Sequence, residues 1–207
     1  MTHKTKGIVL RSIKYGETSL VVTIFTELFG LQAYMVNGAR SSRKTGNKAA
    51  MFQPAAILDL EVYHSDQKQI QRIKEANWSV IYQHVLGDVI KNSIALYMIE
   101  LLHKALKQPE KNHELFYFCE DALLQLDTAG NSIAANLPLF FTLHLADFLG
   151  FRMSTPLKDE PAYLDLKEGE FTYEQPAHPH FLYKEYASLT AELLKTRIPA
   201  ELNELHL

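Results

Sequence analysis

The hydrophobic period of this chain changes once, near Trp78, and the change divides the sequence into two parts of different structural class. Before Trp78, apolar and β-branched residues alternate with polar ones, which is typical of β-strands. After it, apolar residues recur every three to four positions, which is typical of amphipathic helices. A chain of 207 residues can hold two such domains. We therefore expect a β domain over residues 1–78 and a helical domain over residues 79–207.

The first part contains five predicted strands joined mostly by short connections. Gly30, between the second and third strands, suits a turn position with positive φ. No helical pattern long enough for a parallel crossover separates the strands, so a small antiparallel barrel is favoured over a parallel sheet. The predicted strands are residues 7–13, 19–26, 31–36, 57–63 and 70–74.

The second part is predicted to be helical, with one interruption. Gly130 is a candidate C-cap for the second helix, and Pro138 fits the first turn of the third. Residues 151–183 contain four prolines and are expected to form a loop-rich insertion with one hairpin. The predicted helices are residues 85–106, 114–126, 137–150 and 183–196.

Charge is divided unevenly between the two parts. The whole chain has 21 basic and 24 acidic residues, a net charge of −3 that by itself argues against binding a polyanion. Residues 1–48, however, carry eight basic and two acidic residues, so the remaining 159 residues carry a net charge of −9. This asymmetry indicates a basic binding module joined to an acidic one.

The candidate nucleic-acid site is a basic loop at residues 37–48. Cations among small residues after a strand suit a phosphate backbone, because counterion release supplies affinity without fixed hydrogen-bond angles. A second cation cluster lies near the N-terminus, and Tyr34 or Tyr15 could stack on bases, whereas Phe25 and Phe29 are expected in the core. The simpler alternatives are a solvated hairpin or a barrel that binds an acidic protein and never DNA. The candidate DNA-binding residues are Lys4, Lys6, Arg11, Lys14, Tyr34, Arg40, Arg43, Lys44 and Lys48.

Catalytic and metal-binding patterns are weak. The single cysteine, Cys119, excludes an internal disulfide and lies in an apolar helical setting. Neither a P-loop nor a Gly-x-Ser-x-Gly elbow occurs. Glu100 and His103 have the spacing of a di-iron half-site without a second copy, so an enzyme with a metal there is a minor alternative. We expect no catalytic residue, no cofactor and no membrane span, in a cytoplasmic protein associated with the nucleoid.

Several strings resemble one known family. Residues 7–12 (GIVLRS), 14–20 (KYGETSL) and 23–26 (TIFT), followed by Phe29-Gly30 and residues 38–40 (GAR), are similar to the amino-terminal domain of the recombination mediator RecO. Residues 145–151 (LADFLGF) resemble that family's helix ending in a Leu-Gly-aromatic step. The resemblance implies an OB-fold barrel and a helical domain in a non-enzymatic protein that binds single- and double-stranded DNA. It further implies annealing of complementary strands and, with RecR, replacement of SSB by RecA.

The resemblance also implies partner sites and two departures. The acidic SSB tail would fit an apolar groove between helices beside Lys91, Lys104 and Lys107. Many family members carry a four-cysteine zinc site after the Leu-Gly-aromatic step, whereas residues 152–183 contain no cysteine, so zinc is not expected. Family members usually continue for about another helix beyond Leu207, which implies a further segment outside this sequence.

Overall fold

The computed structural model describes residues 1–40, 48–153 and 162–204 of the chain. These residues fall into two compact units, Met1–Thr128 and Ala129–Leu207. The predicted β domain therefore shares its compact unit with the first two helices of the chain.

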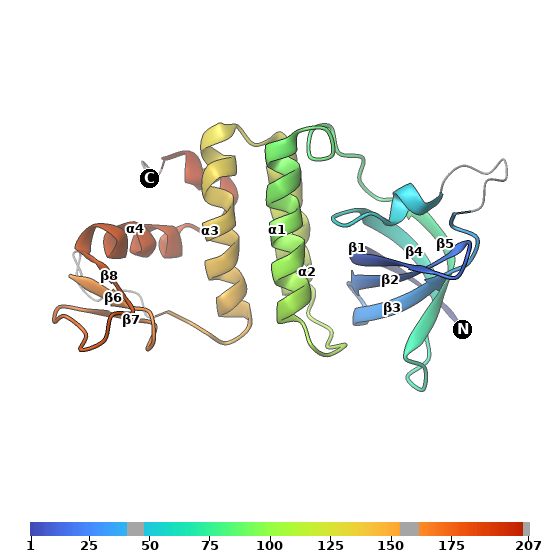
Figure 1. Ribbon diagram of the computed structural model, residues 1–207, viewed down its shortest axis with the longest axis horizontal. Coiled ribbons are helices and arrows are strands. Elements are labelled where there is room, and N and C mark those ends of the chain that lie inside the picture. Colours follow the sequence, from blue (N-terminus) through green and yellow to red (C-terminus); the bar gives the residue numbers. More distant parts are fainter. Residues whose placement is uncertain (41–47, 154–161, 205–207) are drawn as a thin grey trace. The chain divides into compact units, whose positions relative to one another are not determined.

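Five strands close into a barrel in the order β1, β2, β3, β5, β4 (Figure 1). This confirms the barrel expected from the sequence. The prediction of a wholly antiparallel barrel is wrong for one pair, because β3 and β5 run parallel over residues 33–35 and 70–72. The long connection after β3 lets β4 pair with β1, and β5, antiparallel to β4, then meets β3 in parallel. The strands are β1 (Thr2–Tyr15), β2 (Ser19–Thr26), β3 (Gly30–Val36), β4 (Ile57–Tyr63) and β5 (Ile70–Trp78).

Alternation along the strands fills the barrel and also creates a patch on its outside. The interior is apolar and includes Val9, Leu20, Val22, Ile24, Tyr34, Leu58, Leu60 and Val62. Ile8 lies opposite Phe25 on β2 and Ile57 on β4, and all three are fully buried although they point away from the interior. This outer patch must be covered by another element, and each such side chain contributes about 1.5–3 kcal/mol when buried.

Helices α1 (Val89–Ala105) and α2 (His113–Thr128) complete the first unit. Phe116 of α2 contacts Phe25 of the outer patch, with 5.7 Å between ring centroids, and α1 contacts β1. Tyr117 on α2 donates a hydrogen bond of 2.6 Å to Glu27 in the turn before β3. The barrel and the two helices are thus joined by both apolar and polar contacts.

The start predicted for the first helix and the cap predicted for the end of the second differ from those observed. The first helix begins at Val89 rather than at position 85, because the Asp88 side chain accepts hydrogen bonds from the Ile90 and Lys91 amides and acts as its N-cap. Gly130 is not a C-cap of α2, since its φ of −74° and ψ of 172° are extended and it occupies the N-cap position of the next helix.

The second unit contains α3 (Asn131–Phe148), a three-stranded sheet, α4 (Lys184–Lys195) and a short 3-10 helix, η2 (Pro199–Glu204). Helix α3 begins six residues before the predicted start, so Pro138 lies inside it rather than in its first turn. The Ala134 amide donates to the Gly130 carbonyl, which starts the helix upstream of the apolar period. Proline has no amide hydrogen, so the helix continues past Pro138 without the backbone hydrogen bond that position would donate.

The segment predicted as a loop with one hairpin forms a small sheet. Strand β6 (Tyr163–Asp165) pairs with β7 (Glu170–Thr172), which confirms the hairpin, and also with β8 (Phe181–Tyr183). Leu164 is fully buried, and α4 contacts β6 and β8. The third strand, β8, was not predicted, and its last residue, Tyr183, was assigned to the start of the following helix.

Candidate nucleic-acid interface

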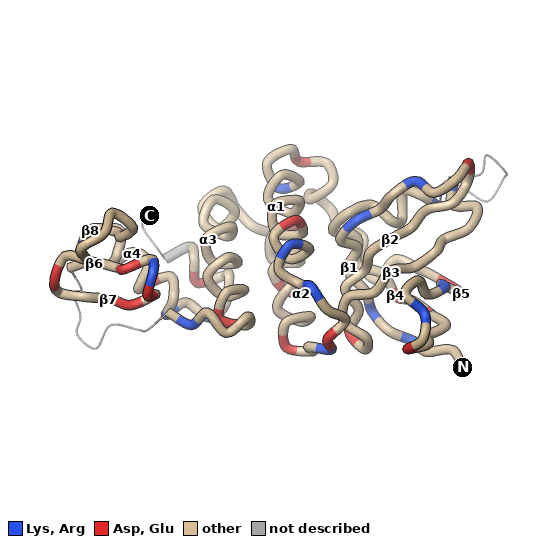
Figure 2. Tube along the Cα trace, turned by 60° about the horizontal axis from the view of Figure 1, so that its bottom comes forward, with Lys and Arg blue, Asp and Glu red and all other residues tan. Residues whose placement is uncertain are grey.

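The lysines and arginines of the barrel lie on several strands and are interspersed with acidic residues (Figure 2). Some of these cations already form ion pairs, whereas others remain available for a phosphate. The two kinds of cation are best compared in two grooves on the barrel.

The groove beside β1 and β4 has mixed charge. Lys4 lies opposite Glu61, and Lys6 lies opposite Asp59, in the β1–β4 register. The groove has a volume of about 460 Å³, and its lining includes these four residues together with Glu27 and Glu75. Two lysines among four carboxylates give this groove a net negative charge, so it is a poor surface for DNA.

Lys6 is also committed to an ion pair. Its ammonium lies 2.8 Å from a carboxylate oxygen of Glu120 on α2, whose side chain is 7% exposed. The hydrogen bond that Lys6 donates to Glu120 raises the pKa of Lys6. The geometry therefore gives Lys6 a structural role between the barrel and α2, and this ion pair competes with the expected phosphate contact.

The predicted continuous path from Lys6 to Arg11 and Lys14 is interrupted. Ile8 lies between them on the outside of β1 and belongs to the patch that the helices cover. Beyond the bulge between Val9 and Arg11, strand alternation places Arg11 and Lys14 on opposite faces of β1. Both residues are exposed, but they do not extend a single row of cations.

A second groove, between the end of β3, β5 and the 3-10 helix η1 (Lys48–Phe52), is cationic. Its volume is about 480 Å³, and Lys48, Arg72 and Lys74 line it together with one acidic residue, Glu75. We call it the β3–β5 groove. It exists because β3 and β5 pair over only three residues before they diverge.

The cations of the β3–β5 groove are not equivalent. Lys74 lies 2.8 Å from Glu61, which partly neutralises it, and this hydrogen bond raises the pKa of Lys74. Within the described residues, neither Lys48 nor Arg72 forms an ion pair. Arg72 also lines a neighbouring pocket of about 410 Å³ together with Lys68 and His64. Arg72 and Lys68 were missed in the sequence because they lie outside the two basic clusters of residues 1–48.

The basic loop reaches the β3–β5 groove at one end. Arg40 donates its backbone amide to the Thr18 carbonyl, and the Ala49 amide bonds to the Ala39 carbonyl at 3.0 Å. These contacts attach both ends of the loop to the barrel, with Lys48 at the groove. Arg43 and Lys44 lie outside the described residues, as do their neighbours at positions 41–47.

The stacking role expected for Tyr34 is wrong. Its ring is fully buried in the barrel interior, and burial raises the pKa of its hydroxyl. Alternation explains the error, because Tyr34 faces inward while its neighbours Ala33 and Met35 face outward. Tyr15, the alternative considered, is 58% exposed at the end of β1. Phe25 is buried and Phe29 packs against the barrel core, as expected.

Comparison with known proteins identifies the family. The chain matches the family model "Recombination protein O N terminal" over residues 1–82 and "Recombination protein O C terminal" over residues 86–155. A protein named DNA repair protein RecO from Flavobacterium johnsoniae is 39% identical over 172 residues, covering 83% of this chain and 71% of the relative. Another so named, from Azobacteroides pseudotrichonymphae, is 32% identical over 195 residues, covering 94% and 80%. The chain belongs to the RecO family.

Membership of the RecO family supports a role in DNA repair and recombination. The closed barrel and the helices after it agree with the fold that the resemblance implied. None of the helices in the described ranges has the length and apolar character needed to cross a membrane.

The resemblance places a zinc site of many RecO proteins after residue 151, and in this chain the described part of that segment, residues 162–183, contains no cysteine. Asp165 accepts hydrogen bonds from the Lys167 and Glu168 amides, and His178 lies 3.1 Å from its other carboxylate oxygen. These contacts hold the turn after β6 by themselves. In the part of the chain that the structure describes, three or more His, Cys, Asp or Glu residues nowhere gather as a metal site would require.

The three lysines expected to bind the SSB tail are placed differently from one another. Lys91 donates a 2.8 Å hydrogen bond to the Asp127 carbonyl, which fixes it at the end of α2. Lys104 lies 2.7 Å from Glu100 on the surface of α1, and the two form an ion pair one helical turn apart. Lys107, exposed after α1, forms no ion pair within the described residues.

Cys119 lies in the core of the first unit. Its thiol is buried within α2, and burial raises its pKa. A protonated thiol with no access to solvent is a poor nucleophile, so its geometry agrees with the expected core position.

Proposed function

We propose that this RecO chain binds single- and double-stranded DNA through the β3–β5 groove and the adjoining basic loop, without sequence preference. The main observation behind this proposal is that Lys48 and Arg72 line the same groove, which has more cations than carboxylates. Lysine and arginine contacts to phosphates supply affinity that is independent of base identity. The DNA-binding residues of this proposal are Lys48 and Arg72, with Arg40, Arg43 and Lys44 in the loop.

The proposal is tested by the salt dependence of binding. Each phosphate contact on single-stranded DNA contributes about −0.7 to the slope of log affinity against log salt. The double substitution Lys48→Ala with Arg72→Ala removes two such contacts, so the slope should become less steep by about 1.4. Affinity should fall to a similar extent for unrelated oligonucleotide sequences.

Lys4→Ala is the matched control for this experiment. Lys4 is an exposed lysine on the same barrel, but it lies in the groove of mixed charge. Its substitution should leave both affinity and slope close to those of the unaltered protein. Equal losses for Lys4→Ala and the double variant would contradict the placement of DNA in the β3–β5 groove.

The proposed role is that of a mediator without a chemical step. Barrel-bound DNA strands would be annealed to complementary strands, and the helical region over residues 79–207 would contact RecR and the SSB tail so that RecA is loaded. Exposed Lys107 supports an electrostatic contribution to the binding of the acidic tail. A strand-annealing assay with SSB-coated oligonucleotides tests this role, and a Lys107→Glu variant should weaken retention on immobilised SSB tail peptide. Such a protein would work in the cytoplasm, at the nucleoid.

A protein-interaction role for the barrel is the second candidate. The groove of mixed charge beside Lys4 and Lys6 favours it, because alternating charges fit a protein surface better than a polyanion. A gel-shift assay with a single-stranded oligonucleotide at moderate salt separates the candidates. Absence of a shift would favour the adaptor.

A further inference from the structure

The small sheet of the second unit presents three aromatic rings on one face. Tyr163 lies opposite Tyr183 in the β6–β8 register, and Phe181 lies opposite Asp165, so alternation places all of these side chains on the same side. Leu164 points to the other side and is buried. The ring centroids of Tyr163, Phe181 and Tyr183 lie 5.2–6.0 Å apart. We call these three residues the aromatic face.

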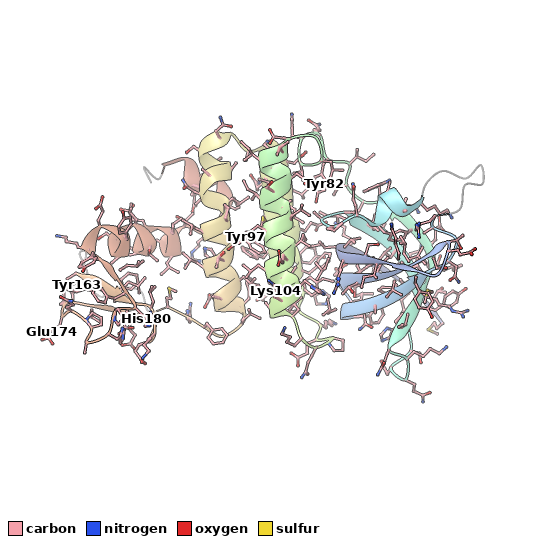
Figure 3. The ribbon with its side chains drawn as sticks, viewed as in Figure 1. Tyr82, Tyr97, Lys104, Tyr163, Glu174 and His180 are labelled. Atoms are coloured by element: carbon pink, nitrogen blue, oxygen red, sulfur yellow. The ribbon has the colours of Figure 1, made fainter. Side chains whose placement is uncertain are left out.

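The aromatic face is open to solvent at Tyr183, which is 62% exposed. Tyr163, labelled in Figure 3, and Phe181 are half-buried against each other. Leu164, on the opposite side of the sheet, is fully buried, and α4 contacts both β6 and β8, so the core of this unit lies on the side away from the aromatic face. Exposed aromatic rings that contact one another are typical of a binding surface.

The surroundings of the aromatic face are acidic. Glu170 on β7 lies opposite Asp165 and therefore on the same side of the sheet as the rings. Glu168 and Glu174 are exposed in the turns before and after β7. Residues 162–185 contain five acidic residues and two lysines, and residues 129–207 carry a net charge of −5. This field repels phosphates and attracts cations.

Arginine is the side chain that matches this combination. Its planar guanidinium group can stack on an aromatic ring while it forms hydrogen bonds to carboxylates in its own plane, whereas the ammonium of lysine attracts a ring only as a point charge. We propose that the aromatic face binds an arginine-containing segment of a partner protein, with guanidinium groups over Tyr163 and Tyr183 and the Glu170 carboxylate, on the same side of the sheet, attracting the segment. This inference goes beyond the DNA-binding proposal, since it uses neither the barrel nor its cations.

The test measures binding of the full chain to a fluorescein-labelled peptide of alternating arginine and glycine, by fluorescence anisotropy. Tyr183→Ala should weaken binding about tenfold, and Glu170→Lys should weaken it to a similar degree. Tyr183→Phe retains the ring and should bind like the unaltered chain. Glu192→Lys makes the same charge change at an exposed position near the end of α4, away from the sheet, and should have little effect.

Three outcomes would overturn the proposal. Equal weakening by Glu170→Lys and Glu192→Lys would indicate attraction by overall charge alone. Equal affinity for a matching peptide of lysine and glycine would exclude guanidinium stacking. Concentration-dependent dimerisation that Tyr183→Ala abolishes, measured by sedimentation equilibrium, would assign the aromatic face to a second copy of this chain. Circular dichroism of each variant confirms that it is folded, and the DNA affinity of the barrel should be unchanged in all of them.

Discussion

At the scale of single residues, Gly30 is constrained both by its local backbone conformation and by packing against a residue that is distant in the sequence. Its φ is +63°, as the turn before β3 requires, and an added Cβ would overlap the backbone of Glu110 between α1 and α2. The position therefore excludes a side chain for two independent reasons. The sequence predicts the first reason from the turn, whereas the second depends on how the helices meet the barrel.

Gly30→Ala should destabilise the first unit by roughly 3 kcal/mol, because it adds both backbone strain and a steric overlap. Gly16→Ala is the control, since Gly16 has a φ of +59° and no heavy atom near the added methyl group. It should cost only about 1 kcal/mol. Urea denaturation measures both values, and equal losses would contradict the close approach of Glu110.

Asp127 is a second residue whose role is structural. Its buried carboxylate accepts hydrogen bonds from the amides of Gln83, His84 and Val85, which attach the segment after the barrel to α2. Desolvation alone would raise the pKa of Asp127, but these three hydrogen bonds, with the nearby His84, lower it.

The lowered pKa gives a pH dependence of definite sign. The stability that ionised Asp127 contributes is fully present above the unfolded-state pKa of about 3.9, and it is lost as pH falls through the lower folded-state pKa. Asp127→Asn should therefore cost about 2 kcal/mol at neutral pH and progressively less under acid conditions. Asp121→Asn, at an exposed position of the same helix, is the control. A loss for Asp127→Asn that does not change with pH would contradict this role.

At the scale of elements, the pair between β1 and α2 distinguishes two lysines that look alike in the sequence. Lys6→Ala would leave the carboxylate of Glu120 buried without its partner, which should cost about 2 kcal/mol because Lys6 itself is partly exposed. Lys4→Ala should have almost no effect on stability. Thermal unfolding checks this contrast, and a larger loss for Lys4→Ala would contradict it.

The same contrast explains what could be predicted from the sequence. Strand alternation is local, so the five strands and the burial of Phe25 could be predicted from short windows. Whether a lysine faces carboxylates depends on the register between strands that are distant in the chain, as for Lys4 opposite Glu61. The prediction that Tyr34 stacks on bases was wrong for a related reason, because alternation alone does not tell which of the two faces of a strand is interior. Arg72 gave no signal, since its groove is formed by the divergence of β3 and β5.

At the scale of the whole molecule, the burial of the outer patch decides which part of the chain can fold alone. Residues 1–78 contain the complete barrel but not the helices that cover Ile8, Phe25 and Ile57. Residues 1–128 contain both, and they form one compact unit. Exposing three large apolar side chains would cost about 4.5–9 kcal/mol at 1.5–3 kcal/mol each, which is comparable to the total stability of many domains.

A fragment of residues 1–128 should therefore unfold cooperatively, whereas a fragment of residues 1–78 should bind a hydrophobic dye and unfold gradually or aggregate. Because the β3–β5 groove lies within both fragments, the longer one should also bind single-stranded DNA with the salt slope of the full chain. Calorimetry and anisotropy measure the two properties separately. Cooperative unfolding of the shorter fragment would show that the helices are not required to stabilise the barrel. A shallower slope for the longer fragment would place some phosphate contacts beyond Thr128. That result would contradict the division of charge, in which the barrel binds DNA and the acidic second unit does not.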